Sequence, residues 1–491
     1  MCGRLFRSQN KTFAFLAIAY LVVLQSFTKG QEVNRTSPTV TPSFRIWRLP
    51  QVENGPVIPS TVPSDSVSVL FQGPTSLDSL IRYAIACNPE IAAARYRARQ
   101  LGARVPQVKS LPDPQLTTTA FLQAIQTAAG PQEAAMSLSQ KFPWFGKLSL
   151  RSQVAYQDTM AAYAQASAVE LKVIEQVKLA YYDLYFLQNA IAETRKLQQP
   201  LKNIIEVARS RYETSVDSSG MVSVLQTQVE LGKLRTELVR LEASQIKAQA
   251  RLAGVLNLPP QTRIDAMRNL HASGLTQQAN TLVALAEQCQ PELAARRREI
   301  ARDRSAVRLA CRDYYPDLTL GLNWYEIGNT GISPFHTGQD AYAMTAGVNL
   351  PIYRKRLNAA VRESQYKQSA SQRRYIASRD RLQTEVLSLY AVLQEQDRTI
   401  QILRSEILSP ASQALDLSIE LYRTGKIDYE QLIDSFRTLL NFRIDYYRRF
   451  ARREQAIASL ERAVGCAVSS KLEEVQRPDA EPVHAPVPSV R

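Results

Sequence analysis

The side chains that most often bind metal ions or act as catalytic acids and bases are scarce in this 491-residue sequence. Its three histidines lie far apart along the chain: His271, His336 and His484. A zinc site needs several histidine, cysteine or carboxylate ligands at short spacings, and none of the three histidines has such neighbours. The sequence therefore predicts no metal site, and it contains no other cofactor-binding pattern.

The cysteines are also dispersed. Cys2 falls in the N-terminal segment, and long intervals separate the other four: Cys87, Cys289, Cys311 and Cys466. They form no Cys-x-x-Cys spacing and no disulfide framework of the kind seen in small secreted domains. We expect them to be small apolar packing residues.

Patterns typical of enzymes and of nucleic-acid-binding proteins are missing as well. The sequence has no nucleophile elbow, no glycine-rich phosphate loop and no paired carboxylates other than ordinary helix charges, which argues against an enzyme. The formal charge of +15 comes from arginines spread along the chain rather than from one cluster. A solvated helix surface explains this charge, so we expect no nucleic-acid partner.

The two ends of the chain differ from its middle. Arg4, Arg7 and Lys11 precede an apolar run at residues 13–24, so residues 1–30 have the order of a signal peptide. The proline-rich segments on either side of the middle are expected to be disordered: residues 31–75 and 469–491. No later stretch is apolar enough for a membrane-spanning helix, so any membrane-embedded part must consist of strands.

Between these ends the sequence repeats itself once. Residues 87–93, CNPEIAA, match residues 289–295, CQPELAA. A period of about two hundred residues is too long for a solenoid and indicates a duplicated half-molecule. We expect the two halves to cover residues 76–270 and 271–468.

Each half has the same predicted order of elements: a helix, two strands joined by a turn, a long helical run and a returning helix. In the first half these elements are expected at residues 77–109, 115–122, 133–141, 147–214 and 221–252, with the turn at 129–131. In the second half they are expected at residues 278–313, 318–326, 341–350, 354–424 and 429–464, with the turn at 328–338. The fold class is therefore mainly α with a small β part. The two shorter helices of a half can stack end to end beside its long helix.

Each strand pair leads into the long helix through a proline and aromatic residues. Pro143 ends the second strand, and Trp144 and Gly146 open the turn into the helix. Pro351 and Tyr353 repeat this arrangement. The aromatics that flank the strands suit a membrane interface, with core packing as the alternative: Trp144, Phe145, Trp324, Tyr325, Tyr342 and Tyr353.

The returning helix of the first half carries a coiled-coil seam, with apolar residues at heptad spacing. Its members are Val224, Leu231, Leu234, Leu238, Leu241, Ala248 and Leu252. Four strands per chain cannot close a barrel, because the smallest transmembrane barrels have about eight strands and lipid does not tolerate open edges. If the strands enter a membrane, several chains must share one barrel.

The repeated motifs resemble those of outer-membrane efflux factors of the TolC-like family. They are NPEIAAA with QPELAAR, LPDPQL with YYPDLTL, SQKFPWFGK with NLPIYRKR and, at the hairpins, RYETS with LYRTGKIDYEQL. The resemblance implies a homotrimer in which four strands per chain form one twelve-stranded β-barrel in outer-membrane lipid. It also implies long antiparallel coiled-coil helices that extend into the periplasm and meet a periplasmic adaptor protein and an inner-membrane pump.

The resemblance places a periplasmic gate at the tip of the second hairpin. Tyr422 stands at the position of a latching tyrosine, Gly425 at the turn and Asp434 at an acidic ring that narrows the pore. Gln431 stands where a second acidic ring can occur, with Glu430 beside it. These five residues are the candidate site.

Two positions depart from the family pattern at this tip. Met221 replaces a latching aspartate and Ile427 replaces an arginine, so the latch cannot use the same ion pairs. The predicted function is a passive exit duct for small molecules or metal ions. FPWFGK favours metal and drug efflux over protein secretion, although no run of methionine or histidine points to a metal. The alternatives are a type I secretion duct and a periplasmic coiled-coil scaffold without a pore.

Overall fold

The computed structural model describes residues 73–214, 219–268, 270, 272–275, 277–329, 338–468 and 470–471. The chain divides into two units, Met1–Gly55 and Pro56–Arg491, and every described residue belongs to the second. The expected signal peptide, most of the expected leader and tail, and all three histidines lie outside the described residues.

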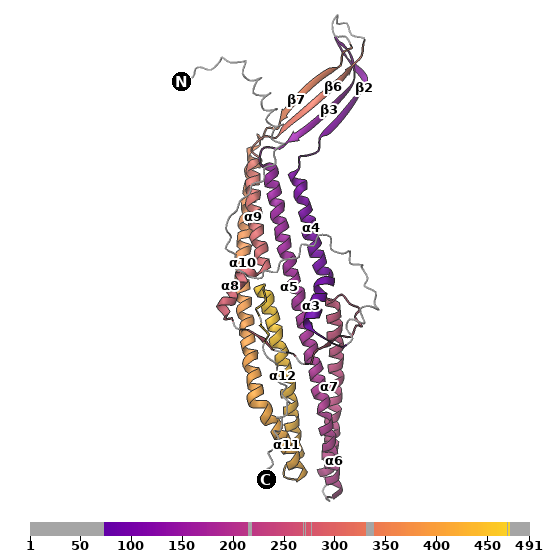
Figure 1. Cartoon of the computed structure of the whole chain (residues 1–491), viewed down its shortest axis with the longest axis vertical. Coiled ribbons are helices and arrows are strands. Elements are labelled where there is room, and N and C mark those ends of the chain that lie inside the picture. The colour runs from indigo at the N-terminus through magenta and orange to yellow at the C-terminus, as the bar shows by residue number, and fades with distance from the viewer. Residues whose placement is uncertain are drawn as a thin grey trace, which may run out of the picture. The chain divides into compact units, whose positions relative to one another are not determined.

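The described part is mainly helical and repeats one order of elements (Figure 1). The first half contains β1 (Pro74–Thr75), α3 (Leu77–Cys87), α4 (Pro89–Lys109), β2 (Gln115–Thr127), β3 (Gly130–Phe142), α5 (Lys147–Lys196), α6 (Gln198–Thr214) and α7 (Ser219–Val255). After β4 (Asp265–Ala266) and β5 (Ser273–Gly274), the second half contains α8 (Ala279–Cys289), α9 (Pro291–Arg312), β6 (Leu318–Ile327), β7 (Ala341–Val348), α10 (Arg354–Ile402), a π-helical turn (Leu403–Ile407), α11 (Leu408–Arg423), α12 (Tyr429–Val464) and β8 (Ser470–Lys471).

The first helix of each half is broken, which corrects the prediction of single helices at 77–109 and 278–313. Asn88 ends α3 and caps α4: its Oδ1 accepts hydrogen bonds from the backbone N–H groups of Glu90 and Ile91, at 2.8 and 3.3 Å. Gln290 accepts from Glu292 N at 3.1 Å in the second half. The residue before a proline is disfavoured in helical conformation, so each Asx/Gln-Pro pair ends one helix and starts the next.

The long helical runs predicted at 147–214 and 354–424 are present, and each is interrupted toward its C-terminal end. Leu197 separates α5 from α6, and the π-helical turn separates α10 from α11. Pro200 and Pro410 lie just after these two points. A proline cannot donate to the carbonyl four residues earlier, so the helical ladder loses one hydrogen bond at the same place in each half.

Four strands form one antiparallel sheet in the order β2-β3-β6-β7. β2 and β3 are longer than predicted, and their turn is at residues 128–129 rather than 129–131, since Pro131 already pairs with Gln126 in the ladder. Gly130 has a φ of +138°, which allows the chain to turn this early. Most of the second predicted turn, 328–338, lies outside the described residues.

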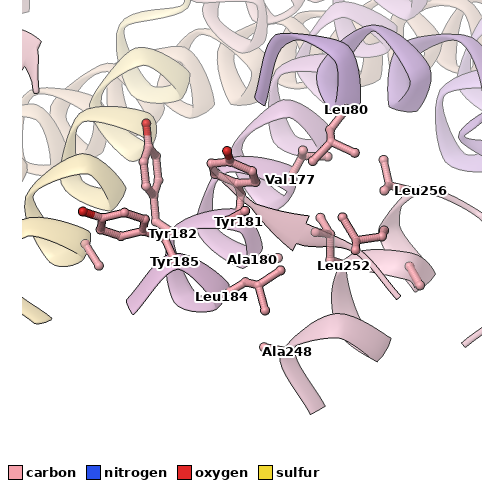
Figure 2. Close-up of a cluster of buried hydrophobic side chains, with 14 of the residues drawn as sticks. Leu80, Val177, Ala180, Tyr181, Tyr182, Leu184, Tyr185, Ala248, Leu252 and Leu256 are labelled. Atoms are coloured by element: carbon pink, nitrogen blue, oxygen red, sulfur yellow. The ribbon is translucent and has the colours of Figure 1, made fainter. Parts of the chain in front are cut away.

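The main core surrounds the middle of α5. Figure 2 shows Tyr181, Tyr182 and Tyr185 of α5 beside Leu80 of α3 and Leu252 of α7. These side chains are buried, and α5 packs against α3, α4, α7, α9 and α12. The predicted positions of α4 and α7 beside α5 are therefore confirmed.

The returning helices match their predictions. α12 spans Tyr429–Val464 as expected, and the apolar seam of α7 is buried or packed against buried residues. Within the part of the chain that the structure describes, no helix combines the length and apolar character that crossing a membrane requires.

Candidate functional site

The tip of the second hairpin is closed by a left-handed glycine. Gly425 has a φ of +76°, and its N–H donates to Tyr422 O at 3.1 Å. The next N–H, of Lys426, donates to Leu421 O at 2.9 Å. This pair of hydrogen bonds is the Schellman ending of a helix, which glycine adopts without steric cost. It reverses the chain between α11 and α12.

Two buried tyrosines lie on either side of this turn. The rings of Tyr422 and Tyr429 are 6.3 Å apart at an angle of 67°, an edge-to-face contact. Ile427 packs against the cluster that contains both rings. Burial raises the pKa of the Tyr429 hydroxyl to about 12. Where the family pattern has an arginine, this tip therefore has an apolar side chain in a hydrophobic cluster.

A polar link joins the first hairpin to the second near their tips. The carboxylate of Glu230 on α7 pairs with Arg437 on α12 and accepts a hydrogen bond from Lys233 at 2.6 Å. Gln226 Nε2 donates to Glu430 Oε1 at 3.2 Å. Burial alone would raise the pKa of Glu230, but the hydrogen bonds from Arg437 and Lys233 outweigh burial and lower it. The link holds α7 and α12 together through charge-assisted bonds.

A groove of about 350 Å³ runs along this link. Its apolar wall on α7 is formed by the exposed side chains of Val222, Leu225 and Val229, and Ile433 contributes from α12. Glu230 and Arg437 also line it. The hairpin tips thus combine an open apolar groove with an ion pair across it.

The structure separates the predicted gate residues. Glu430 contacts the first hairpin through Gln226, whereas Gln431 and Asp434 are exposed on α12. No ion pair of Asp434 occurs among the described residues. Met221, the second departure from the family pattern, is exposed on α7.

The residues that join the hairpins were not predicted from the sequence. Glu230 and Lys233 have the spacing of ordinary charges on a helix surface. Nothing in their spacing indicated that Arg437, two hundred residues later, would complete the link. Only the duplicated order of hairpins, which predicts that the two tips lie side by side, could have suggested a search for charges of opposite sign on α7 and α12.

The first elbow, residues 143–147, contains a buried ion pair. Lys147 is 3% exposed, and its Nζ lies 2.7 Å from Asp317 Oδ1 and 3.1 Å from Tyr315 O. Asp317 Oδ1 also accepts from Trp144 N at 3.0 Å. Burial alone would raise the pKa of Asp317, but the hydrogen bonds from Lys147 and Trp144 outweigh it and lower it.

The other residues of this elbow set the path of the chain. Gly146 caps α5 with a φ of +84°. Trp144 stacks on Tyr315 with ring centroids 5.3 Å apart and an interplanar angle of 12°. Trp144 is thus a packing residue here, while its neighbour Phe145 is exposed.

The second elbow, residues 351–356, has no comparable support. Tyr353 is the N-cap of α10 without a side-chain capping bond and is 71% exposed. Ile352, between Pro351 and Tyr353, is also exposed. Tyr342 is exposed on β7, and Trp324 donates from Nε1 to Asp340 Oδ2 at 3.0 Å. Exposed aromatic and apolar side chains near the strand ends are typical of contact with a lipid interface or another chain.

Among the described residues, no three histidine, cysteine or acidic side chains are grouped as metal ligands would be. The candidate site therefore consists of a closed tip, a polar link and an apolar groove. The polar link can hold α7 and α12 together or release them, and the groove can bind a helix of another protein.

The chain is similar in sequence and in fold to known bacterial proteins. The cobalt-zinc-cadmium resistance protein CzcC of Cupriavidus metallidurans is 23% identical over 399 residues, which cover 80% of this chain and 90% of CzcC. Among solved structures, CusC, described as forming a transmembrane channel, matches with a TM-score of 0.68 at 17% identity, over 81% of this chain and 93% of CusC. The outer membrane protein VceC of Vibrio cholerae matches with a TM-score of 0.65 at 20% identity, over 80% of this chain and 96% of VceC.

The family model described as outer membrane efflux protein matches residues 80–258 and 263–466, which is most of both halves. The related proteins are efflux proteins and channels rather than enzymes. The match to the family model extends over more than half of the sequence, and the chain belongs to the outer membrane efflux protein family.

Proposed function

We propose that the protein is the passive exit duct of a three-part efflux system in the outer membrane. Three copies would bring their strands together in one twelve-stranded barrel, and their helices would extend into the periplasm. The observation that carries the proposal is the sheet: β2 and β7 are edge strands, and nearly all their residues are exposed. Open edges are not tolerated in lipid, so each edge needs a partner from another copy.

The helices support the same assembly. α10 packs against α8, α9 and α12, yet large apolar side chains along it are exposed, Tyr366 by 74%. α7 likewise exposes Val239 and Ile246. A neighbouring copy would cover these exposed apolar side chains. A scaffold without a pore would have no use for the exposed strands.

The hairpin tips are the proposed docking end for a periplasmic adaptor, which would connect the duct to an inner-membrane pump. The groove between α7 and α12 supports this role, because an apolar groove bounded by an ion pair suits an amphipathic helix. The proposed cargo is metal ions or other small molecules. The protein's relative CzcC is a cobalt-zinc-cadmium resistance protein, which supports metal ions as the cargo.

Cell fractionation and an unheated denaturing gel test the duct. We expect the protein in the outer-membrane fraction as a detergent-resistant trimer that heating converts to a monomer. Asn349 N donates to Asp317 O, so by alternation Gly347 and Thr345 bond β6 and the N–H of Ala346 points to the open edge of β7. Replacing Ala346 by Pro should abolish the trimer, because proline removes this donor. Ala346→Val keeps the donor, so it is the matched control and should keep the trimer. A folded monomer in mild detergent would contradict the proposal.

The cargo is tested in a strain that lacks the gene. Reintroducing the gene should restore resistance to cobalt, zinc or cadmium salts more than resistance to organic drugs. Restored secretion of a protein without either resistance would favour the type I secretion alternative.

A further inference from the structure

Two cysteines that are far apart in the sequence meet at the base of the second half. Cys289 is the last residue of α8, and Cys466 follows Gly465, which ends α12. Both side chains are half-buried, and Cys466 packs against the cluster formed by α8, α10 and α12. The two cysteines therefore lie at the ends of two helices that are packed against each other.

The backbones at this point are in close contact. A Cβ built on Gly465 would lie 2.8 Å from Cys289 O and 2.7 Å from Gln290 Cα, and Gly465 has a φ of +85°. Only glycine fits this position, so the approach is a fixed feature of the fold. A disulfide needs Cα atoms about 4.4–6.8 Å apart. The contact places Gly465, the residue before Cys466, against the backbone carbonyl of Cys289, so the two cysteines lie in neighbouring segments of chain.

Neighbouring bonds hold both cysteines in place. Gln290 Nε2 donates to Arg462 O at 3.1 Å and to Ala463 O at 3.2 Å, which fixes the start of α9 against the end of α12. Beyond Cys466, β8 pairs with β5, just before α8. The chain is thus tied on both sides of the cysteine pair.

The two thiols are near enough to influence each other. Burial, and next the neighbouring Cys289 thiol, raise the pKa of the Cys466 thiol to about 12. Uncatalysed exchange at such a thiol is slow, because the thiolate is the reacting form. Closing the pair would therefore depend on an oxidase.

We propose that Cys289 and Cys466 form an intrachain disulfide in the exported protein. The proposal rests on the proposed outer-membrane function, because only export brings the chain into an oxidising compartment. The oxidant is the disulfide of a periplasmic thiol oxidase. One thiolate of the pair attacks that disulfide, forms a mixed disulfide and releases one oxidase thiol.

The second thiolate of the pair then attacks the sulfur of its partner and releases the second oxidase thiol. Two electrons and two protons pass from the cysteines to the oxidase, and one S–S bond forms. The bond joins α8 to the end of α12. It closes most of the second half into one covalent loop.

The first half has no such pair, and it provides the comparison. Asn257 has a φ of +58° after α7, and Leu258 follows it, as Cys466 follows Gly465. The left-handed residue after α7 is thus Asn257, which takes the place of Gly465 in the first half. Cys87 is the counterpart of Cys289, but the counterpart of Cys466 in the first half is Leu258, so Cys87 has no cysteine to pair with there.

The test counts thiols in the full-length protein. Cells are harvested into an alkylating reagent, the outer-membrane fraction is denatured, and thiols are labelled with a maleimide polymer before and after reduction. We expect reduction to add two labelled thiols in the wild type. Cys289→Ser and Cys466→Ser should each abolish this increase, and Cys87→Ser should keep it. A wild-type protein in which reduction adds no thiols would overturn the proposal.

A second measurement does not depend on location. If the protein is absent from the outer-membrane fraction, the duct proposal fails, and the purified full-length protein is incubated with oxidised glutathione. A linked peptide that contains Cys289 and Cys466 supports the pairing, and its absence overturns it. Reductant should lower the melting temperature of the oxidised wild type by several degrees and leave that of Cys466→Ser unchanged.

Discussion

The two halves of the chain repeat one order of elements but differ in their neighbours. In the first half α5 packs against α3, α4, α7, α9 and α12, and several of its side chains, including Tyr181 and Leu184, are fully buried. In the second half α10 packs against α8, α9 and α12 and exposes much of its surface. The same supersecondary unit is thus a core element in one half and a surface element in the other.

The elbows show the difference at single residues. Lys147 corresponds to Lys355 by the spacing of Pro143 and Pro351, and Asp317 corresponds to Gln115. Lys147 is buried against Asp317, whereas Lys355 is exposed, and Gln115 lies exposed at the start of β2. The first elbow has a partner within the chain because α9 packs against α5 and places the following Asp317 beside Lys147.

This asymmetry indicates where a neighbouring copy would fit. α5 packs against both α4 and α9. In the part of the chain that the structure describes, α10 packs against α9 but not against α4. In the proposed trimer, α4 of the next copy would complete the surroundings of α10. The second elbow would then lie beside Gln115, at the start of β2, in the next copy. The second half would depend mainly on trimer assembly for its stability.

The largest expected difference between the halves is at the elbow lysines. Lys147→Ala removes a buried cation and leaves Asp317 paired with the more exposed Lys141 at 3.3 Å. The free energy of unfolding should fall by about 3 kcal/mol, the lower end of the effect of breaking a buried pair. Lys355→Ala is the matched control and should change it by less than about 0.5 kcal/mol. Denaturant unfolding in detergent measures both. Equal effects of the two substitutions would mean that the elbows are equivalent.

The same ion pair predicts a dependence on pH. The pKa of Asp317 is lower in the folded protein than its ordinary value of 3.8, so the unfolded chain binds the proton first as the pH falls. The stabilisation is fully present above that value and is lost as the pH falls through the folded pKa. Melting temperatures from pH 7 to pH 3 should fall more steeply for the wild type than for Asp317→Asn. Asp434→Asn, an exposed control, should follow the wild type.

A smaller effect is expected at the helix caps. Asn88→Ala removes the cap of α4 and should cost about 1–2 kcal/mol, as cap substitutions do. Asn88→Asp keeps the capping oxygen and loses the amide that donates to Val255 O, so it separates the two contributions. Gln290→Ala is the counterpart in the second half and should cost less, because asparagine is the more favourable cap. Chemical denaturation ranks the three variants. A larger loss for Gln290→Ala would reverse the comparison.

The smallest effect concerns ion selectivity at the tip of the second hairpin. Three copies of Asp434 around one axis would attract cations, and salt would screen them. Asp434→Ala should reduce the cation preference in planar bilayers by about twofold at low salt and less at high salt. Glu430→Gln should have little influence, since Glu430 is bonded to Gln226. If only Glu430→Gln alters selectivity, the ring position is Glu430.

Local patterns predicted much of the fold. The heptad seam predicted α7, the turn at Gly425 predicted the start of α12, and the alternating residues predicted the strands. The breaks at Asn88 and Gln290 were missed although each precedes a proline, because the apolar period continues across them. Contacts between the halves could not be predicted: nothing adjacent to Lys147 indicates Asp317, and nothing adjacent to Cys289 indicates Cys466. Such pairs depend on the packing of helices, which a single sequence does not specify.

The prolines at 200 and 410 have a mechanical consequence for the hairpins. Each lies just beyond an interruption in the helix, so we expect the hairpin to bend more readily there than within its regular helices. α6 contains 17 residues, which gives it a length of about 25 Å at 1.5 Å per residue. A change of about 10° at Leu197 would displace its far end by about 4 Å, roughly the width of one side chain. In the proposed trimer, a small angular change at these two points in each of the three copies would change the width of the opening between the hairpin tips.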